Sequence, residues 1–293
     1  MRLSLSIGIM AYNEEAMIGS LLKAITQQRN CHGRLHEIFV VASGCTDNTE
    51  NIVRRHMQKD HRIKLLIQSQ REGKASAINL FLEKASGEIL ILESADTVPD
   101  KDAFEKLIAP FIDPKVGMTG ARPTPVNPVD TFIGFTVHLM WTLHHKIALS
   151  APKLGELVAF RNIVREIPKV TAVDEAYIEA IIKYKGYDLR YVSDALVKNK
   201  GPDTVSDFIK QRRRIAVGHK YLYRDQKYEV STHNPFKIFK TLISEIPLNP
   251  KGIAWTVGAI ILEAIGRLLG LYDYVTRKES PYIWDIACST KRW

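Results

Sequence analysis

The sequence predicts an α/β protein with a parallel sheet flanked by helices. Two features of the first 120 residues support this prediction: a series of short apolar runs, and the amphipathic stretches that alternate with them. Buried parallel strands joined by crossover helices produce this alternation. Ligands bind such sheets at the carboxyl ends of the strands. The loops after the apolar runs are therefore the expected functional site.

The elements follow in order along the chain. An apolar run at 3–10 predicts the first strand, and Asn13 is the expected N-cap of the helix after it. One face of that helix is apolar, with Met17, Ile18, Leu21, Leu22 and Ile25. Further strands are expected at 36–43, 62–69 and 87–93, with helices at 45–57 and from about residue 73.

The pattern changes after three prolines between residues 123 and 128. The next elements predicted are helices at 132–149, 174–186 and 203–223 and strands at 156–161 and 189–197. From residue 235 the chain is amphipathic. We therefore expect a catalytic domain over 1–228 and a C-terminal helical segment for membrane association or oligomerisation over 229–293.

Composition limits the class of protein. The chain has 293 residues, is 45% hydrophobic and carries a formal charge of +9, which suits an anionic partner such as a phosphorylated metabolite or an acidic lipid. Cys31, Cys45 and Cys288 lack metal-ligand spacing. Because three is an odd number, a reducing cytosol is favoured. The N-terminus lacks the apolar core of a signal peptide. No nucleic-acid-binding module is recognised, and a nucleic-acid partner is not expected.

Carboxylates and cations gather in the predicted strand-end loops. A metal-chelated diphosphate fits this mixture, because carboxylates hold Mg²⁺ or Mn²⁺ and cations meet phosphate oxygens. Neither a P-loop nor a Rossmann glycine fingerprint is present. The residues concerned are Asn13, Glu14, Glu15, Asp47, Arg71, Lys74 and Asp96.

Six motifs between residues 3 and 222 resemble those of the family 2 glycosyltransferases, in particular membrane-associated bacterial or archaeal members. In order the motifs are AYNEEAMIGSLL, SGCTDNT, REGKASAIN, LILESADTVPD, AVDEAYI and QRRRI. The resemblance implies the GT-A fold, a Rossmann-like arrangement with a mixed, mainly parallel sheet flanked by helices. It also implies a nucleotide-sugar donor such as a UDP- or GDP-sugar. It assigns donor contacts to Ala11, Tyr12, Asn13, Glu14 and Asp47, and nucleotide or diphosphate contacts to Arg71, Gly73 and Lys74.

The resemblance also implies a metal ligand and a base. The fourth motif normally contains Asp-x-Asp, whereas this chain has Ser94-Ala95-Asp96, so Asp96 is the metal ligand that remains. Asp174 corresponds to the catalytic base. The second motif has Ala42 and Ser43 where many relatives carry Asp, which leaves the donor base open. Ile215 replaces the Trp that, in processive members of the family, supplies an aromatic surface for the acceptor sugar. Gln211, Arg212, Arg214 and Glu175 are expected near the donor diphosphate or the acceptor, and His219 is a candidate for a further metal or diphosphate contact.

Each assignment has a structural alternative. The first loop and Asp47 would serve as helix caps, Asp96 would only end a strand, and Asp174 would be an N-cap while Glu175 acts as the base. The arginine run would form a solvated or lipid-facing surface.

The last segment contains two helical patterns. A lysine-bearing amphipathic helix is expected at 235–246, followed by an apolar stretch at 252–272 that is interrupted by Glu263 and Arg267, whose spacing allows them to pair. Each such charge near mid-bilayer costs ~2.5–3.5 kcal/mol. Three alternatives remain open for this stretch: interfacial or half-inserted association with a membrane, a true span, and a helix in a soluble core or dimer. The first alternative places the chain on the cytoplasmic face of the cell membrane.

The functional hypothesis is a metal-dependent, inverting glycosyltransferase acting on a glycan or lipid-linked acceptor. The alternatives are a catalytically inactive nucleotide-sugar-binding scaffold, for which Ser94 is the best argument, and a sugar-phosphate nucleotidyltransferase, whose glycine-rich N-terminal signature is absent. The sequence leaves the sugar, the acceptor and the oligomeric state open.

Overall fold

The computed structural model describes residues 2–28, 33–233, 235–276 and 288–290, so Cys31 lies outside the described residues. The chain forms two compact units. Unit 1 comprises Met1–Pro123, Leu154–Lys169 and Asp174–Asn199, and unit 2 comprises Thr124–Lys153, Val170–Val173 and Lys200–Trp293. The expected boundary near residue 228 falls inside unit 2, because the helices on both sides of it pack together.

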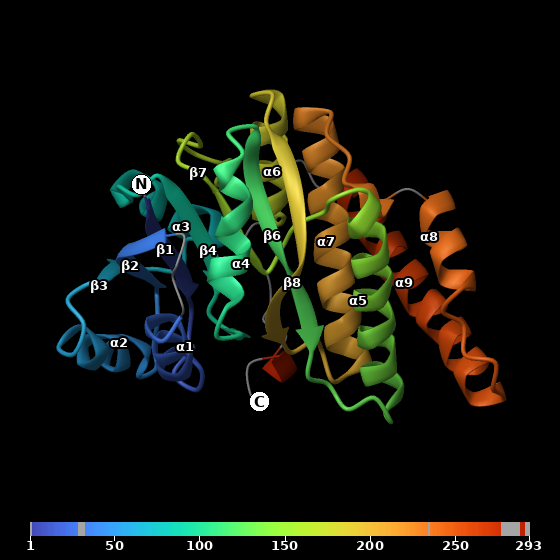
Figure 1. Ribbon diagram of the computed structural model, residues 1–293. Helices are drawn as coiled ribbons and strands as arrows, with labels where there is room; N and C mark the ends of the chain where they lie inside the picture. Colours follow the sequence, from blue (N-terminus) through green and yellow to red (C-terminus); the bar gives the residue numbers. More distant parts are fainter. Residues whose placement is uncertain (1, 29–32, 234, 277–287, 291–293) are drawn as a thin grey trace. The chain divides into compact units, whose positions relative to one another are not determined.

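Unit 1 is built on an eight-stranded mixed sheet with the order β3-β2-β1-β4-β7-β6-β8-β5 (Figure 1). The neighbours β3, β2, β1 and β4 run parallel, whereas β7 runs antiparallel to β4 and β6, and β5 antiparallel to β8. The predicted α/β fold class is confirmed. The strands are β1 (Leu3–Ala11), β2 (Gly33–Ser43), β3 (Ile63–Gln68), β4 (Ile89–Ser94), β5 (Thr97–Pro99), β6 (Val116–Pro125), β7 (Leu157–Arg161) and β8 (Asp188–Asn199).

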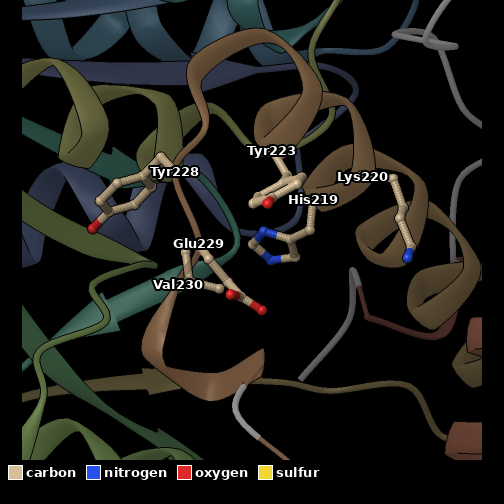
Figure 2. Close-up of a pocket in the computed structure, with 6 residues that line it drawn as sticks. All are labelled: His219, Lys220, Tyr223, Tyr228, Glu229 and Val230. Atoms are coloured by element: carbon tan, nitrogen blue, oxygen red, sulfur yellow. The ribbon is translucent and has the colours of Figure 1, made fainter.

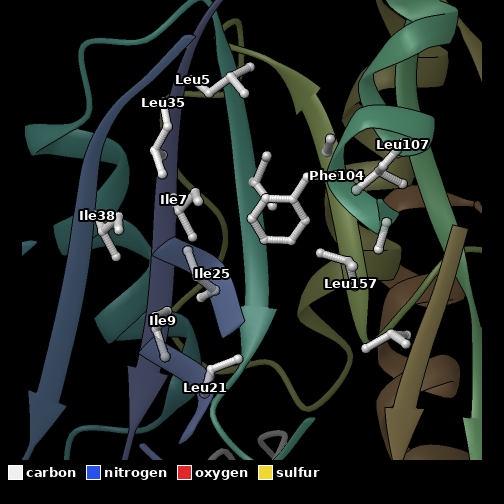
Figure 3. Close-up of a cluster of buried hydrophobic side chains, with 14 of the residues drawn as sticks. Leu5, Ile7, Ile9, Leu21, Ile25, Leu35, Ile38, Phe104, Leu107 and Leu157 are labelled. Carbon is white, nitrogen blue, oxygen red and sulfur yellow. The ribbon is translucent and has the colours of Figure 1, made fainter. Parts of the chain in front are cut away.

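The main core of unit 1 lies between this sheet and the helices α1 (Ile18–Thr26) and α4 (Ala103–Ile108). Alternate residues of β1 point into it, and Leu21, Ile25 and Phe104 reach it from the helices (Figure 3). Each of these side chains is fully buried, which stabilises the fold by about 1.5–3 kcal/mol apiece. The other helices of unit 1 are α2 (Thr49–Met57), α3 (Lys74–Lys84) and α6 (Asp174–Tyr184), with the 3₁₀ turn η1 (Ala109–Ile112).

Several elements between β4 and α5 escape the sequence patterns. Helix α4 has six residues, too few for a helical period to show. Strand β6 contains two glycines and two prolines, a composition that predicts a linker rather than a strand. It pairs with β7 all the same, with Met118 opposite Phe160. The proline-rich stretch at which the sequence pattern changes therefore begins as the end of a sheet strand.

Unit 2 is helical. Its α-helices are α5 (Phe132–Ser150), α7 (Val205–Gln226), α8 (Pro235–Ile243) and α9 (Pro250–Thr276), and it has 3₁₀ turns at η2 (Ser231–His233) and η3 (Cys288–Thr290) (Figure 1). Helix α9 packs closely against α7. A Cβ on Gly270 would come within 2.7 Å of the Ala216 side chain, and one on Gly266 within 2.6 Å of Arg212. Small residues on α9 thus allow the two backbones to approach.

Ion pairs join α7 to α9. The Arg212 guanidinium donates two hydrogen bonds to Glu263, at 2.5 and 2.9 Å, and the Arg213 guanidinium donates two to Asp273, at 2.5 and 2.6 Å. Arg267 also donates to Glu263, at 2.7 Å, which confirms the pairing expected from their spacing. Asp273 is only 2% exposed. Bidentate pairs of this kind fix orientation as well as charge, so α9 is held along α7.

A buried glutamate closes the end of β4. Glu93 is 2% exposed, and its carboxyl accepts a hydrogen bond from the Thr97 hydroxyl. The same hydroxyl lies 2.7 Å from the Ser94 carbonyl oxygen, so its proton is shared between two acceptors. Burial raises the pKa of Glu93 well above its usual value near 4.5, although the Thr97 hydrogen bond acts in the opposite direction.

Replacing Arg213 by alanine is expected to lower the free energy of unfolding by about 2–4 kcal/mol, because a buried Asp273 carboxylate loses its bidentate partner. The matched control is Arg224→Ala, which removes an exposed pair with Asp225 and should cost less than about 1 kcal/mol. Urea denaturation measures both. Equal losses for the two variants would contradict a stabilising role of the α7–α9 pair.

Glu93 should make stability fall with rising pH. Its folded pKa is raised, so from the unfolded value near 4.5 up to the folded pKa the native state holds a proton that the unfolded chain has lost. The free energy of unfolding then falls by up to ~1.4 kcal/mol per pH unit across that window. Glu93→Gln should remove this slope, and the exposed Glu83→Gln should keep it. Identical pH profiles for wild type and Glu93→Gln would refute the assignment.

Candidate functional site

The loops after β1 and β2 are tied together by side chains. The Thr46 backbone N–H donates to Asn13 Oδ1 at 2.8 Å, and Asn13 Nδ2 donates to Thr46 Oγ1 at 3.1 Å. The expected role of Asn13 as a helix cap is therefore wrong. Helix α1 starts only at Ile18, with no side-chain cap, and Asn13 adopts a left-handed conformation with φ 53°. Its side chain connects the first loop to the second instead.

Asp47 performs two structural tasks at this junction. Its Oδ1 accepts hydrogen bonds from the backbone and hydroxyl of Thr49, at 3.0 and 2.6 Å, at the start of α2. Its Oδ2 accepts from the Glu15 backbone at 3.0 Å. Partial burial would raise the pKa of Asp47, but these donors outweigh it and lower the pKa below 3.8. The N-cap of α2 is Asn48, without a side-chain cap, so Asp47 lies one residue before the cap and holds the first loop against the start of the helix.

The third loop meets the first two. The Arg71 guanidinium lies 4.4 Å from the centroid of the Tyr12 ring, a cation–π contact that covers the end of β1. Gly44 has φ 63°, and a Cβ there would come within 2.5 Å of the Arg71 nitrogen. Gly73, with φ 90°, begins α3, and Ala11 is buried at the end of β1. Three loops far apart in sequence thus share one edge of the sheet.

A lysine and two carboxylates form a second group in unit 1. Lys74 Nζ lies 2.5 Å from Glu175 Oε1 and 4.0 Å from Asp174 Oδ2. Asp174 is the first residue of α6 and is 4% exposed. Loss of hydration lowers the pKa of Lys74, but Glu175 and Asp174 outweigh that effect and raise it above 10.5. The ammonium is therefore charged, and it brings α3 and α6 together.

Sequence reasoning missed Glu93 and Glu156. Glu156 raises the pKa of both Lys74 and Glu93 through its charge, and its backbone oxygen accepts from Ser94 Oγ at 3.4 Å. Its φ of 62° is uncommon for glutamate. Nothing in the local sequence marks either residue, because their importance comes from strands that are distant along the chain.

Asp96 lies in the turn between β4 and β5. Within the described ranges, no group of three or more His, Cys, Asp or Glu side chains is arranged to hold a metal ion. A single carboxylate still suits Mg²⁺ or Mn²⁺ when the ion takes its other ligands from substrate phosphates and water, the usual arrangement for Mg²⁺. Asp96 therefore fits an ion delivered with a diphosphate rather than a preformed protein cage.

The remaining predicted residues lie on α7 in unit 2. Arg212 is paired with Glu263, as described above, while Arg214 Nε is buried and has no hydrogen-bond partner in the described part of the chain. Gln211 is half-buried on the same helix. His219 is 7% exposed and lines a pocket near the end of α7 (Figure 2). Unit 1 thus gathers the donor and base candidates, and unit 2 carries the QRRRI residues.

Sequence comparison relates the chain to curated bacterial proteins. It is 28% identical over 236 residues to the probable glycosyltransferase YdaM of Bacillus subtilis, covering 74% of this chain and 55% of that protein. It is 26% identical over 227 residues to the poly-beta-1,6-N-acetyl-D-glucosamine synthase of Staphylococcus aureus, covering 73% and 54%. The chain spans about half the length of these relatives.

Structural comparison shows the same fold in solved enzymes. The mannosyltransferase PcManGT of Pyrobaculum calidifontis, in complex with GDP-Man and Mn²⁺, has a TM-score of 0.63 at 22% identity, covering 94% of this chain and 81% of that one. Glucosyl-3-phosphoglycerate synthase of Mycobacterium tuberculosis, with Mn²⁺, UDP and phosphoglyceric acid, has a TM-score of 0.53 at 17% identity, covering 76% and 78%. The expected GT-A fold is confirmed.

Residues 6–161, more than half of the chain, match the family described as Glycosyl transferase family 2. The match includes the loops after β1, β2, β3 and β4 and stops before α6. Together with the sheet order and the structural neighbours, it establishes the family resemblance that the motifs predict. The chain belongs to glycosyl transferase family 2.

Proposed function

We propose that the chain transfers a sugar from a nucleoside-diphosphate sugar to an acceptor hydroxyl, with inversion at the anomeric carbon. The observation that carries this proposal is the group formed by Lys74, Asp174 and Glu175. It joins a cation at the start of α3 to a carboxylate pair at the start of α6, 100 residues later. A leaving diphosphate requires the cation, and an attacking hydroxyl requires a carboxylate.

The donor nucleotide is expected against the joined strand-end loops. The Tyr12 ring, which stacks with Arg71 on one side, offers a flat surface. Asn13 and the buried Glu14 lie next to it in the chain, held by Thr46 and Thr49, and are the proposed polar contacts. Asp47 holds this surface in place through Thr49 and Glu15 and is proposed as a further contact to the nucleotide. Arg71, Gly73 and Lys74 would meet the diphosphate, since α3 directs its N-terminal backbone N–H groups there.

Asp174 is the proposed base. Glu175 is directly paired with the Lys74 ammonium at 2.5 Å, whereas Asp174 lies 4.0 Å from it. The carboxylate engaged in the closer pair is the poorer proton acceptor, which supports Asp174 over the alternative base Glu175. As the acceptor oxygen attacks C1, Asp174 would take its proton, a contribution typically worth ~10²–10⁴-fold in rate.

Charge on the departing diphosphate would be stabilised by Lys74 and by the N-terminus of α3. Asp96 would hold a divalent cation there, which when bound supplies further positive charge to the leaving group. Because this chain has Ser94 in place of a second carboxylate, affinity for the free ion should be low and should rise when the donor is present.

The donor class and the acceptor rest on relatives. GDP-Man and UDP are bound by two proteins of the same fold, and a curated relative is a synthase of poly-N-acetylglucosamine. A UDP- or GDP-sugar donor and a glycan or lipid-linked acceptor follow as proposals. Ser94 favours one alternative, an inactive donor-binding scaffold. The sugar-phosphate nucleotidyltransferase alternative gains no support from the match to this family.

Helix α9 points to a membrane surface. Among the described residues it is the one helix long and apolar enough to cross a bilayer, with a mean hydropathy of 1.6 over its most apolar 18 residues, 28% of which are buried. Its ion pairs to α7 would break if it crossed, so an interfacial position is favoured over a span. The outward apolar residues are Ile253, Val257, Ile260, Ile261, Ile265, Leu268, Leu271, Tyr272 and Val275.

Turnover of a nucleotide sugar tests the proposed function. With Mn²⁺ and membrane lipids as a source of acceptor, the protein should release nucleoside diphosphate from one sugar in a panel of UDP-, GDP- and dTDP-sugars. Asp174→Asn should slow release by about 10²–10⁴-fold. Asp96→Ala should raise the Mn²⁺ concentration required, and the exposed Asp130→Ala is the matched control. Donor binding without release would support the scaffold, and no donor binding would overturn the proposal.

Vesicle sedimentation tests the interfacial position of α9. The protein should bind phosphatidylglycerol vesicles more strongly than phosphatidylcholine vesicles, because lysines on α8 and α9 flank the apolar face. Ile261→Glu combined with Leu268→Glu should reduce binding by at least ~10-fold, since both side chains would leave the apolar layer as charges. Ile112→Glu, at an 89% exposed site in unit 1, is the control. Binding unchanged by the double substitution would contradict this placement.

A further inference from the structure

A pocket of about 270 Å³ lies at the C-terminal end of α7, inside unit 2. It is lined by His219, Lys220 and Tyr223 from the helix and by Tyr228, Glu229 and Val230 from the segment that follows. Figure 2 shows the His219 imidazole between the Tyr223 ring and the Glu229 carboxylate, with Lys220 and Tyr228 on opposite sides. Five of the six lining side chains thus carry a polar group or an aromatic ring that a ligand could use.

The pocket continues the face of α7 that begins at Ile215. Residues four apart on a helix lie on one face, so Ile215, His219 and Tyr223 are successive positions on it. The related motif of processive enzymes has a Trp where this chain has Ile215. An aromatic surface is therefore missing at that position and present two turns later, at Tyr223, which is 54% exposed.

The lining suits a neutral polyhydroxylated ligand. Among the lining side chains, Lys220 and Glu229 carry opposite charges, so the lining offers no cluster of cations of the kind that a diphosphate requires. Tyrosine rings pack against C–H groups, while carboxylate, imidazole and ammonium groups exchange hydrogen bonds with hydroxyls. The volume is just below the ~300–1,000 Å³ typical of drug-sized ligands, which suits one sugar unit better than a nucleotide.

The base of the pocket is preformed. His219 and Val230 are 7% and 2% exposed, and they place a polar and an apolar surface at its floor. Lys227, next to the pocket wall, is held at the C-cap of α7 with φ 50°, and its ammonium lies 5.9 Å from the Tyr223 ring. The turn that carries Tyr228 and Glu229 is thereby directed back along the helix.

We propose that this pocket binds one sugar unit of the acceptor, stacked on Tyr223 and hydrogen-bonded to Glu229 and His219. The assignment of the bound sugar to the acceptor rests on the proposed function. The binding of a carbohydrate in this pocket is independent of the proposed function. A pocket on α7 would give the chain an acceptor contact that does not depend on the Trp absent at 215.

The experiment uses methyl glycosides of glucose, galactose, mannose and N-acetylglucosamine as probes, with saturation-transfer NMR on the full chain. At least one glycoside should bind the wild type. Tyr223→Ala should weaken binding by about 2- to 10-fold, the range expected for loss of an aromatic contact. Tyr223→Phe should retain binding because it keeps the ring. Tyr184→Ala removes a 62% exposed tyrosine from unit 1 and should leave binding unchanged.

Three results would overturn the proposal: no glycoside bound by the wild type, equal affinity in wild type and Tyr223→Ala, or weakened binding of GDP or UDP with Mn²⁺ in Tyr223→Ala, which would assign the pocket to the donor. Circular dichroism confirms that each variant is folded. Donor hydrolysis by the wild type is measured in the same preparations. If hydrolysis is absent while glycoside binding depends on Tyr223, the proposed function fails and the pocket assignment stands.

Discussion

The parallel pairing of β3, β2, β1 and β4 is the constraint on which the rest of unit 1 depends. Parallel strands all end at one edge of a sheet, so the loops after them must meet there whatever their separation in sequence. The contacts of Tyr12 with Arg71 and of Asn13 with Thr46 are consequences of that geometry. A site at this edge needs only residues of the right chemistry at loop positions, which is what the motifs supply.

Ion pairing determines the structural role of two arginines on α7. In unit 2, Arg212 and Arg213 are both turned toward α9, where Glu263 and Asp273 neutralise them. Two of the three arginines of the QRRRI motif therefore hold α9 against α7. Arg214 takes part in neither of these two pairs. The same pairs hold the Glu263 and Asp273 carboxylates on the face of α9 that packs against α7. The outer face of α9 is therefore mainly apolar, while its carboxylates are paired on the face that packs against α7.

The sequence predicts the fold class, the order of the long elements and the pairing of Glu263 with Arg267, because these depend on period and spacing. It fails for Asn13, whose amide bonds to a loop 33 residues away rather than to its own helix. It also fails for β6, whose prolines and glycines are tolerated in a strand that pairs with β7. The roles of Glu93 and Glu156 are not predicted from the sequence for the same reason as that of Asn13. The raised pKa of Glu93 results from burial and from the nearby Glu156 charge, and both depend on tertiary contacts. The site assignments themselves remain predictions.

Ser94 and Glu93 together explain how a trimmed metal motif remains compatible with this fold. Two ionised carboxylates at the end of β4, without a cation between them, would repel each other in a partly buried turn. In this chain one position is a neutral hydroxyl, and the neighbouring Glu93, whose pKa is raised by burial, contacts the Thr97 hydroxyl. Both features limit the negative charge in the turn that presents Asp96. If Asp96 holds the proposed divalent cation, the donor diphosphate has to supply the missing negative charge, so metal binding and donor binding are coupled under this proposal.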